Sequence, residues 1–233
     1  MHDHGVYIAP RESRHIRGDC VLTLTDQLRH RCWDDVINIT FSNHDVKGHT
    51  GSDWLRIGLI PPNLEIEIPF RALLPHRLEN ILVVGKAFSA THDALPAIRM
   101  QADLENLGGV AAIAAAIAAR ERRSLRQIDV KHLQARLVDE AVLPPQVLTR
   151  TLAENRYSDS ELQHMIDTLP ADPLYTYSDM ELTDLFTNPI PLVEICSAGP
   201  GVIPLLEQAL IHADGPRKVR LAQALALVGS NMG

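Results

Sequence analysis

The sequence predicts an α/β region followed by an all-α tail of helical hairpins. Three observations support this fold class. Residues 1–80 contain short β-branched or alternating runs, residues 100–123 form one long alanine-rich run, and residues 151–233 show helix starts without strand-like alternation. With 233 residues, of which 45% are hydrophobic, the chain is long enough to bury a core in one large domain or two small ones.

The strands are expected in the first 80 residues. Residues 21–25 and 36–41 alternate and are rich in β-branched side chains. Residues 64–68, Leu-Glu-Ile-Glu-Ile, alternate strictly, which predicts a strand with one buried and one solvated face. Residues 81–84, Ile-Leu-Val-Val, lack polar alternation, which is typical of a strand buried on both faces.

A long helix is predicted over residues 100–123, after a loop that extends to about Pro96. Its interior contains Gly108 and Gly109. Each interior glycine costs about 1 kcal/mol relative to alanine. The pair therefore predicts that a strand or a ligand approaches the helix backbone closely.

The tail is predicted to be helical throughout. A helix over residues 130–140 and a turn at Pro144-Pro145 precede it, and Ser158, Ser160, Ser178 with Glu181, and Pro200 are candidate helix starts. Residues 202–211 and 219–229, joined through Gly215-Pro216, resemble one hairpin of a HEAT-type array. One hairpin does not cover its own apolar faces, so we expect the chain to be truncated within such a tail.

Composition excludes several classes of protein. The net charge of −7 argues against nucleic acid as the main partner. Three cysteines without CxxC spacing, and no apolar signal sequence at the N-terminus, predict reduced thiols and a cytoplasmic location. The most apolar run, residues 110–119, is about half of what a membrane span needs, so no membrane contact is expected.

Three segments together resemble a family of bacterial FAD-dependent oxidoreductases. They are residues 11–19 (Arg-Glu-Ser-Arg-His-Ile-Arg-Gly-Asp), residues 68–75 (Ile-Pro-Phe-Arg-Ala-Leu-Leu-Pro) and residues 80–101, which begin Asn-Ile-Leu-Val-Val-Gly-Lys and end Ala-Ile-Arg-Met-Gln. The segments occur in the family's order and spacing, and the similarity continues to about Pro144.

The resemblance implies a Rossmann-like FAD domain interleaved with a substrate domain. It assigns residues 1–125 to the C-terminal part of such an enzyme, with substrate-domain strands over residues 1–79 and a flavin-closing strand and helix over residues 80–124. Residues 126–150 form a connecting helix and turn, and residues 151–233 form the tail. The backbone N–H groups of Met100, Gln101 and Ala102 would face the flavin, because a helix N-terminus favours negative charge.

The dinucleotide-binding fingerprint GxGxxG is absent from the sequence. The nearest match, Gly199-Pro-Gly201-Val-Ile-Pro, ends in proline and indicates a helix-start turn. We therefore expect FAD to be held jointly with an N-terminal half or subunit that supplies the fingerprint, and the chain alone to bind FAD weakly. A natural subunit, a fragment and a truncated gene all remain open.

The resemblance and the residue chemistry together select the candidate site residues. His92 is a candidate for substrate binding or proton transfer, and its alternative is a loop histidine bonded to backbone. Arg99 is a candidate for substrate or flavin contact, and its alternative is an ion pair with Asp103. Arg11 and Arg14, near Glu12, suit a carboxylate or a polarised carbonyl, and their alternative is a buried ion network. Cofactor contacts are expected from Gly85, Lys86 and Ser89, in addition to the helix start.

The predicted reaction is hydride transfer from a small organic substrate to N5 of the flavin. Two other functions stay open: a helical protein-interaction module with a relic flavin half-site, and a metal-dependent hydrolase. No third metal ligand has defined spacing from His44, Asp45 and His49, or from His2 and His4, so no metal is expected. The substrate, the electron acceptor and the attachment of the flavin are not specified by these residues.

Overall fold

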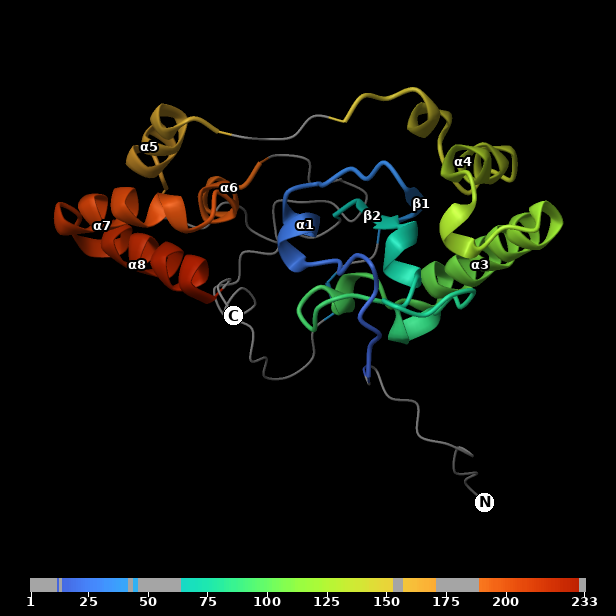
Figure 1. Cartoon of the computed structure of the whole chain (residues 1–233). Helices are drawn as coiled ribbons and strands as arrows, with labels where there is room; N and C mark the ends of the chain where they lie inside the picture. Colours follow the sequence, from blue (N-terminus) through green and yellow to red (C-terminus); the bar gives the residue numbers. More distant parts are fainter. Residues whose placement is uncertain are drawn as a thin grey trace, which may run out of the picture. The chain divides into compact units, whose positions relative to one another are not determined.

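The computed structural model describes residues 12, 14–41, 44–45, 64–152, 157–170 and 189–230 (Figure 1). The chain divides into two compact units. Residues 1–22, 33–40 and 68–150 belong to the first, which we call the α/β unit, and residues 23–32, 41–67 and 151–233 belong to the second, which we call the helical unit.

A two-stranded sheet confirms two of the predicted strands. Strand β1 (Val36–Thr40) pairs with β2 (Ile66–Pro69). The alternation predicted for residues 64–68 is only partly correct, because Glu65 is exposed while Glu67 is buried. Helices α3 (Gln101–Glu121) and α4 (Val130–Asp139) both pack against β1 and against each other (Figure 1).

Three segments of the α/β unit are joined by main-chain hydrogen bonds, and we call them the three-segment layer. They are residues 16–22, 71–75 and 83–91. The first and third are linked by Ile16 N–H to the Ala87 carbonyl (2.9 Å) and by Leu22 N–H to the Ser89 carbonyl (3.1 Å). Ser89 N–H donates to the Ala72 carbonyl at 3.0 Å, which adds the second segment. The three segments that carry the family resemblance therefore lie side by side.

Gly18 lies where these segments approach most closely. A Cβ at this position would lie 2.8 Å from Ser89 Cβ, 2.9 Å from the Cys20 carbonyl oxygen and 3.1 Å from the Ala72 carbonyl oxygen. By contrast, a Cβ at Gly108 or Gly109 would meet nothing within 4 Å among the described residues. No described segment of the chain therefore approaches the glycine pair closely, whereas such an approach does occur at Gly18. Close approach by a ligand stays a prediction.

Residues 21–25 do not form the predicted strand. Leu22 makes one isolated bridge to Ala90, and helix α1 (Leu24–Leu28) begins two residues later. The Thr23 hydroxyl accepts from Asp26 N–H at 3.1 Å, and the Asp26 carboxylate accepts from Thr23 N–H at 3.0 Å. This capping box satisfies helix-end N–H groups locally, and it outweighs the β-propensity of the valine and threonine side chains.

Residues 81–84 are not a strand either. Their side chains are half-buried or, for Ile81, exposed, so burial on both faces is wrong. Val83 N–H donates to the Leu73 carbonyl at 2.9 Å, but no described strand pairs with this segment along its length. A fully apolar strand needs neighbours that cover both faces, and the described residues do not supply them.

Helix α3 confirms the long helix predicted over residues 100–123. Its buried face consists of Leu107, Val110, Ala111, Ala114, Ile117 and Ala118. The helix ends at Arg122, which adopts the left-handed conformation.

By its length and composition, α3 is apolar enough to cross a membrane, although residues 110–119 alone are too short to do so. The core helix of a globular protein can have the same length and composition. Its packing against β1, α4 and two turns favours the core assignment.

Short 3-10 turns connect the elements of the α/β unit. They are η1 (Phe70–Leu73), η2 (Gly85–Ala87), η3 (Leu95–Ala97), η4 (Leu125–Gln127) and η5 (Pro145–Leu148). The turns η2 and η4 both pack against α3. The third segment of the family resemblance, residues 80–101, therefore packs through η2 against the helix that follows it.

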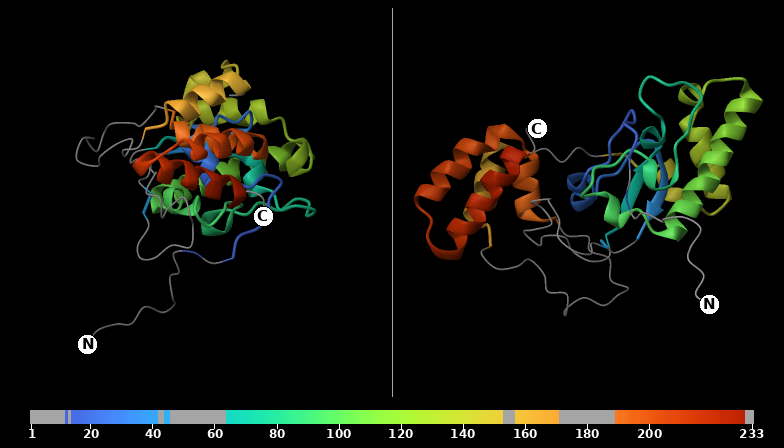
Figure 2. Two further views of the ribbon diagram at one scale, coloured as in Figure 1. Left: turned by 90° about the vertical axis from the view of Figure 1, so that its left-hand side faces the viewer. Right: turned by 90° about the horizontal axis from the view of Figure 1, so that it is seen from below.

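The helical unit consists of α1, α5 (Asp159–Asp167), α6 (Pro191–Ser197), α7 (Ile203–Ile211) and α8 (Gly215–Ser230). Helices α7 and α8 form the predicted hairpin, and α6 packs against α8 (Figure 2). Ser158 caps α5 as predicted, and Pro200 opens the turn η7 (Pro200–Val202) before α7. Gly215 and Pro216 lie in the first turn of α8 rather than before it. Ser178 and Glu181 lie outside the described residues.

A buried ion pair holds α1 to the tail within the helical unit. Arg29 Nε lies 3.1 Å from Glu194 Oε2, and the Glu194 side chain is almost fully buried in α6. Burial and the nearby Glu194 carboxylate raise the pKa of Tyr157. Residues 23–32, although they lie between two segments of the α/β unit in sequence, therefore pack as part of the helical unit.

Candidate flavin and substrate site

The first and third resemblance segments meet at a carboxylate between two histidines. His92 Nδ1 lies 2.7 Å from both carboxylate oxygens of Glu12. His15 Nε2 lies 3.6 Å from Glu12 Oε1, and His15 Nδ1 lies 3.1 Å from the Ala90 carbonyl oxygen. The two segments therefore place three titratable side chains together, although Glu12 and His92 are 80 residues apart.

The structure describes two of the three predicted arginines. Arg14 is exposed, and Arg99 is half-buried immediately before Met100, which is the N-cap residue of α3. Arg11 lies outside the described residues. Among the predicted catalytic residues, His92 makes a short polar contact with Glu12.

The helix start is available for a negatively charged group. Met100 has extended backbone and no side-chain hydrogen bond that caps the helix, and Gln101 and Ala102 are exposed in the first turn. A 21-residue helix carries about half a positive charge at this end. The chemistry of these donors fits the electron-rich edge of a flavin ring.

The turn η2 provides open backbone next to α3. Gly85 has φ +73°, which favours glycine, and a Cβ there would meet nothing within 4 Å. Lys86 is half-buried in the same turn. The open backbone at Gly85 and the donors of the helix start have a chemistry that fits the cofactor. Contacts of Gly85, Lys86 and the helix start with the flavin stay predictions.

Ser89 has a role inside the fold. Its hydroxyl accepts from Gly18 N–H at 3.0 Å, and the side chain is fully buried in the three-segment layer. A contact between Ser89 and the flavin stays a prediction.

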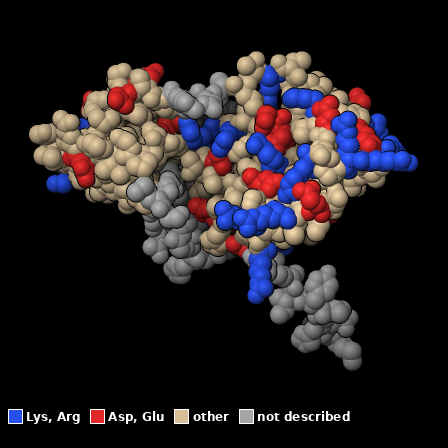
Figure 3. Space-filling model, in the orientation of Figure 1, with Lys and Arg blue, Asp and Glu red and all other residues tan. Residues whose placement is uncertain are grey.

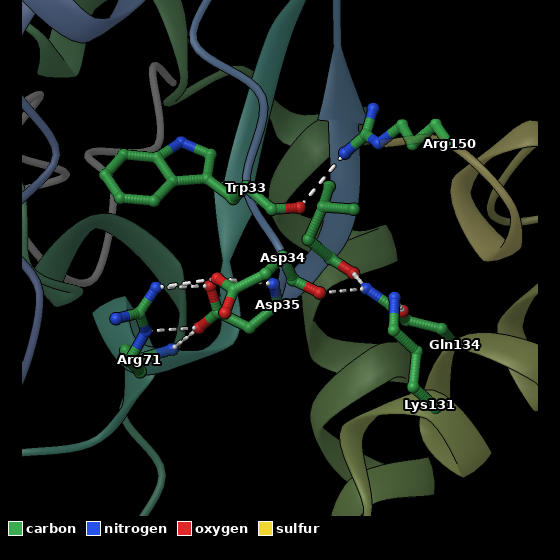
Figure 4. Close-up of polar contacts among 8 residues, drawn as sticks. Trp33, Asp34, Asp35, Arg71, Lys131, Gln134 and Arg150 are labelled. Atoms are coloured by element: carbon green, nitrogen blue, oxygen red, sulfur yellow. Dashed lines mark hydrogen bonds and ion pairs between the residues drawn. The ribbon is translucent and has the colours of Figure 1, made fainter. Parts of the chain in front are cut away.

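An acidic pair and an arginine fix the start of β1, and the sequence did not single them out (Figure 4). Arg71 Nε lies 2.9 Å from Asp35 Oδ2, and Arg71 Nη2 lies 2.9 Å from Asp35 Oδ1 and from Asp34 Oδ1. The Arg71 guanidinium lies 6.0 Å from the centre of the Trp33 ring. Hydrogen bonding to Asp35 raises the pKa of Arg71 above its usual value, so the guanidinium stays charged.

Helix α4 joins the same cluster through Gln134. Its buried side-chain amide donates to the Asp34 carbonyl at 2.9 Å and to the Val36 carbonyl at 3.0 Å (Figure 4). Lys131 donates to the Gln134 oxygen at 2.8 Å, and Arg150 donates to the Trp33 carbonyl at 3.0 Å. The Gln134 amide nitrogen therefore has an acceptor for each of its two hydrogens, and this network fixes α4 on β1.

Replacing Asp35 by asparagine is expected to lower the free energy of unfolding by about 2 kcal/mol, because an amide donor would then face the donors of Arg71. One of these donors is the Arg71 backbone N–H, 2.9 Å from Asp35 Oδ2. Urea denaturation followed by circular dichroism measures the change. Asp34→Asn is the matched control, since its side chain is 72% exposed against 7% for Asp35, and a shift within about 0.5 kcal/mol is expected.

A second ion cluster ties the loop of residues 75–80 to η4. Arg126 Nε lies 2.8 Å from Asp19 Oδ2, and the same guanidinium donates to the carbonyls of Pro75 and Leu78. His76 Nδ1 lies 3.3 Å from Asp19 Oδ1. Hydrogen bonding to Arg126 lowers the pKa of Asp19 below 3.8, its usual value, despite the opposing effect of burial.

The lowered pKa predicts an acid-sensitive contribution to stability. Asp19 stabilises the folded state while it is ionised, so its contribution is present above its unfolded pKa and is lost as pH falls through its folded pKa. We expect wild type to be more stable than Asp19→Asn at about pH 6, and the two to converge as pH falls below about 4. Urea denaturation at several pH values measures the difference. A constant difference down to about pH 2 would contradict the assignment.

The described residues contain no group of three or more histidine, cysteine or acidic side chains arranged to hold a metal ion. His44 and Asp45 are described, whereas His2, His4 and His49 lie outside the described residues. Burial raises the pKa of the Cys196 thiol to about 12, so this cysteine in α6 is a neutral packing residue.

The donors at the start of α3 and the open backbone at Gly85 are compatible with a flavin-binding protein. Residues 2–137 match the model of a protein family described as FAD dependent oxidoreductase. This match covers more than half of the chain, and the protein belongs to that family. No curated protein and no solved structure matches the chain. The cofactor that the family implies is FAD.

Proposed function

We propose that this chain supplies the substrate side of the flavin site in an enzyme that oxidises a small organic substrate by hydride transfer to FAD. The observation that supports this proposal is the three-segment layer, which joins the family's segments by main-chain bonds and leaves His92 exposed directly after them. When bound, the flavin accepts the hydride. The chain's own residues bind and orient the substrate and receive its proton.

The predicted residues other than Ser89 have the following roles in this proposal. The N–H groups of Met100, Gln101 and Ala102 stabilise negative charge at the flavin ring, because the α3 start is not capped by a side chain. Open backbone at Gly85 allows close approach, and Lys86 provides positive charge. Arg14 and Arg99 bind a polar group of the substrate. Arg11, outside the described residues, is proposed to act with Arg14.

We further propose that a polypeptide segment with a GxGxxG turn completes the site. The 233 residues contain no such sequence, yet FAD binding requires a cradle for the pyrophosphate. Helix α3 offers a matching surface. Beyond its first two turns, its exposed face has small side chains at helical spacing, Gly109, Ala112, Ala116 and Ala119, and we call this the small-residue face. Small side chains allow the backbone of a neighbouring strand or helix to approach closely.

Co-expression of the chain with a GxGxxG protein encoded next to it tests the proposal. We expect the two to purify together with bound FAD, seen as flavin absorbance, and Gly109→Leu to remove both the association and the flavin. Gly109 is exposed, so the variant chain by itself should fold normally. Ala222→Leu, at an exposed position of α8, is the matched control and should retain the flavin. Full flavin occupancy in Gly109→Leu would overturn the small-residue face as the contact.

A further inference from the structure

We propose that Glu12 is a positioning residue that fixes His92 in the tautomer with Nε2 unprotonated, so that Nε2 accepts the hydroxyl proton of an alcohol substrate. The first step is the contact between the two side chains. His92 Nδ1 lies 2.7 Å from each carboxylate oxygen of Glu12, which is the short distance of a charge-assisted hydrogen bond. An ionised carboxylate only accepts, so Nδ1 holds the proton and Nε2 holds the lone pair in neutral His92.

The second step is the exposure of the three side chains to solvent. The side chains of His15, Glu12 and His92 are 14%, 23% and 65% exposed, respectively. The carboxylate therefore lies between a mostly buried histidine and a mostly exposed one. Of the two imidazoles, His92 is the one that a substrate can reach, and its Nδ1 is already used by Glu12.

The third step is the rigidity of the pair. His15 Nδ1 is 3.1 Å from the Ala90 carbonyl, and its Nε2 is directed at Glu12 at 3.6 Å. Ile16 N–H donates to the Ala87 carbonyl and Thr91 N–H donates to the Leu22 carbonyl, at 2.9 Å each. The segment that follows Glu12 is thus held against the segment that precedes His92, which limits how far the two side chains can separate.

The reaction step follows from this geometry and rests on the proposed function. Bound FAD would accept the hydrogen of the substrate's C–H bond together with its electron pair, as hydride. The O–H bond would break with the proton passing to His92 Nε2, and a carbonyl would form. The resulting imidazolium is stabilised by the Glu12 carboxylate at Nδ1. A carboxylate behind a histidine base acts in this way by holding the tautomer and the ring orientation.

Nitrogen-detected NMR of the full chain labelled with ¹⁵N-histidine tests the proposal without flavin or substrate. At about pH 9, where imidazole is neutral, His92 should show protonated Nδ1 and unprotonated Nε2. Glu12→Ala should abolish this preference, and His92→Gln identifies the signal. His132 and Glu121, with 3.1 Å between Nδ1 and carboxylate, form a matched exposed pair, so Glu121→Ala should leave the His92 tautomer unchanged.

Protonated Nε2 at His92 in the wild type would overturn the proposal, whether or not the Glu12→Ala variant folds. A tautomer that is unchanged in a folded Glu12→Ala variant would overturn it too. The test is independent of the proposed function. If the tautomer depends on Glu12 but the assembled enzyme turns over normally without His92, the positioning by Glu12 stands and the catalytic role of His92 fails.

Discussion

Replacing Gly18 by alanine is expected to lower the free energy of unfolding of the α/β unit by about 3 kcal/mol, or to prevent its folding. The new Cβ would lie 2.8 Å from Ser89 Cβ and 2.9 Å from the Cys20 carbonyl oxygen. Two of its three close neighbours are backbone carbonyl oxygens, which do not move aside as a flexible side chain does. Moving the Ala72 carbonyl would weaken its hydrogen bond from Ser89 N–H (3.0 Å), which joins two segments of the three-segment layer.

Urea denaturation by circular dichroism measures the loss, and amide hydrogen exchange of residues 83–91 locates it. Gly109→Ala is the matched control, since it adds the same methyl group in open space on an exposed helix face. Helix propensity predicts that this control gains about 1 kcal/mol. If the two alanine variants have equal stability, close packing around Gly18 does not contribute to folding.

Two glycine sites show which part of this fold the sequence could predict. Gly108 and Gly109 attracted attention because glycine within a helix conflicts with local propensity. Gly18 lies in an irregular segment where glycine causes no such conflict, and its neighbours Ala72 and Ser89 are distant in sequence. A close approach between distant segments leaves no local pattern, so only the structure identifies it.

Sequence patterns predicted the secondary structure correctly where a few neighbouring residues specify the whole element. The apolar pattern of β1 and the cap at Ser158 both gave the correct elements, because each element is specified within a few residues. Residues 21–25 failed because two local signals compete there. The side chains favour a strand, but the capping box of Thr23 and Asp26 starts α1.

The sequence allowed residues of the candidate site to be predicted, but not which of them contact each other. His92 and Glu12 were both noted from the segments that resemble the family, yet only the structure shows that they are in contact. The pair of Asp35 and Arg71 was missed, because 36 residues separate them and neither has an unusual neighbourhood in sequence. Figure 3 shows charged side chains of both signs across the α/β unit, so charge pattern alone does not distinguish this pair from solvated neighbours.

In the assembled, FAD-loaded enzyme, His92→Ala is expected to lower kcat by about 10²- to 10⁴-fold, which is the usual contribution of a positioned general base. The bound FAD should be nearly unchanged, because the flavin contacts are proposed for the α3 start and Gly85 rather than for this side chain. Stability should also change by less than about 0.5 kcal/mol, since His92 is largely exposed. Steady-state kinetics and flavin absorbance on the same preparation measure both quantities.

The matched control is His132→Ala, which removes another exposed histidine from a glutamate pair in the α/β unit. It should leave kcat, KM and flavin content unchanged. A loss of flavin in His92→Ala, with the remaining flavin-loaded molecules fully active, would show that His92 holds the loop and does not transfer protons. A fall in kcat with KM and flavin unchanged would instead place the missing interaction in the transition state, as a proton acceptor requires.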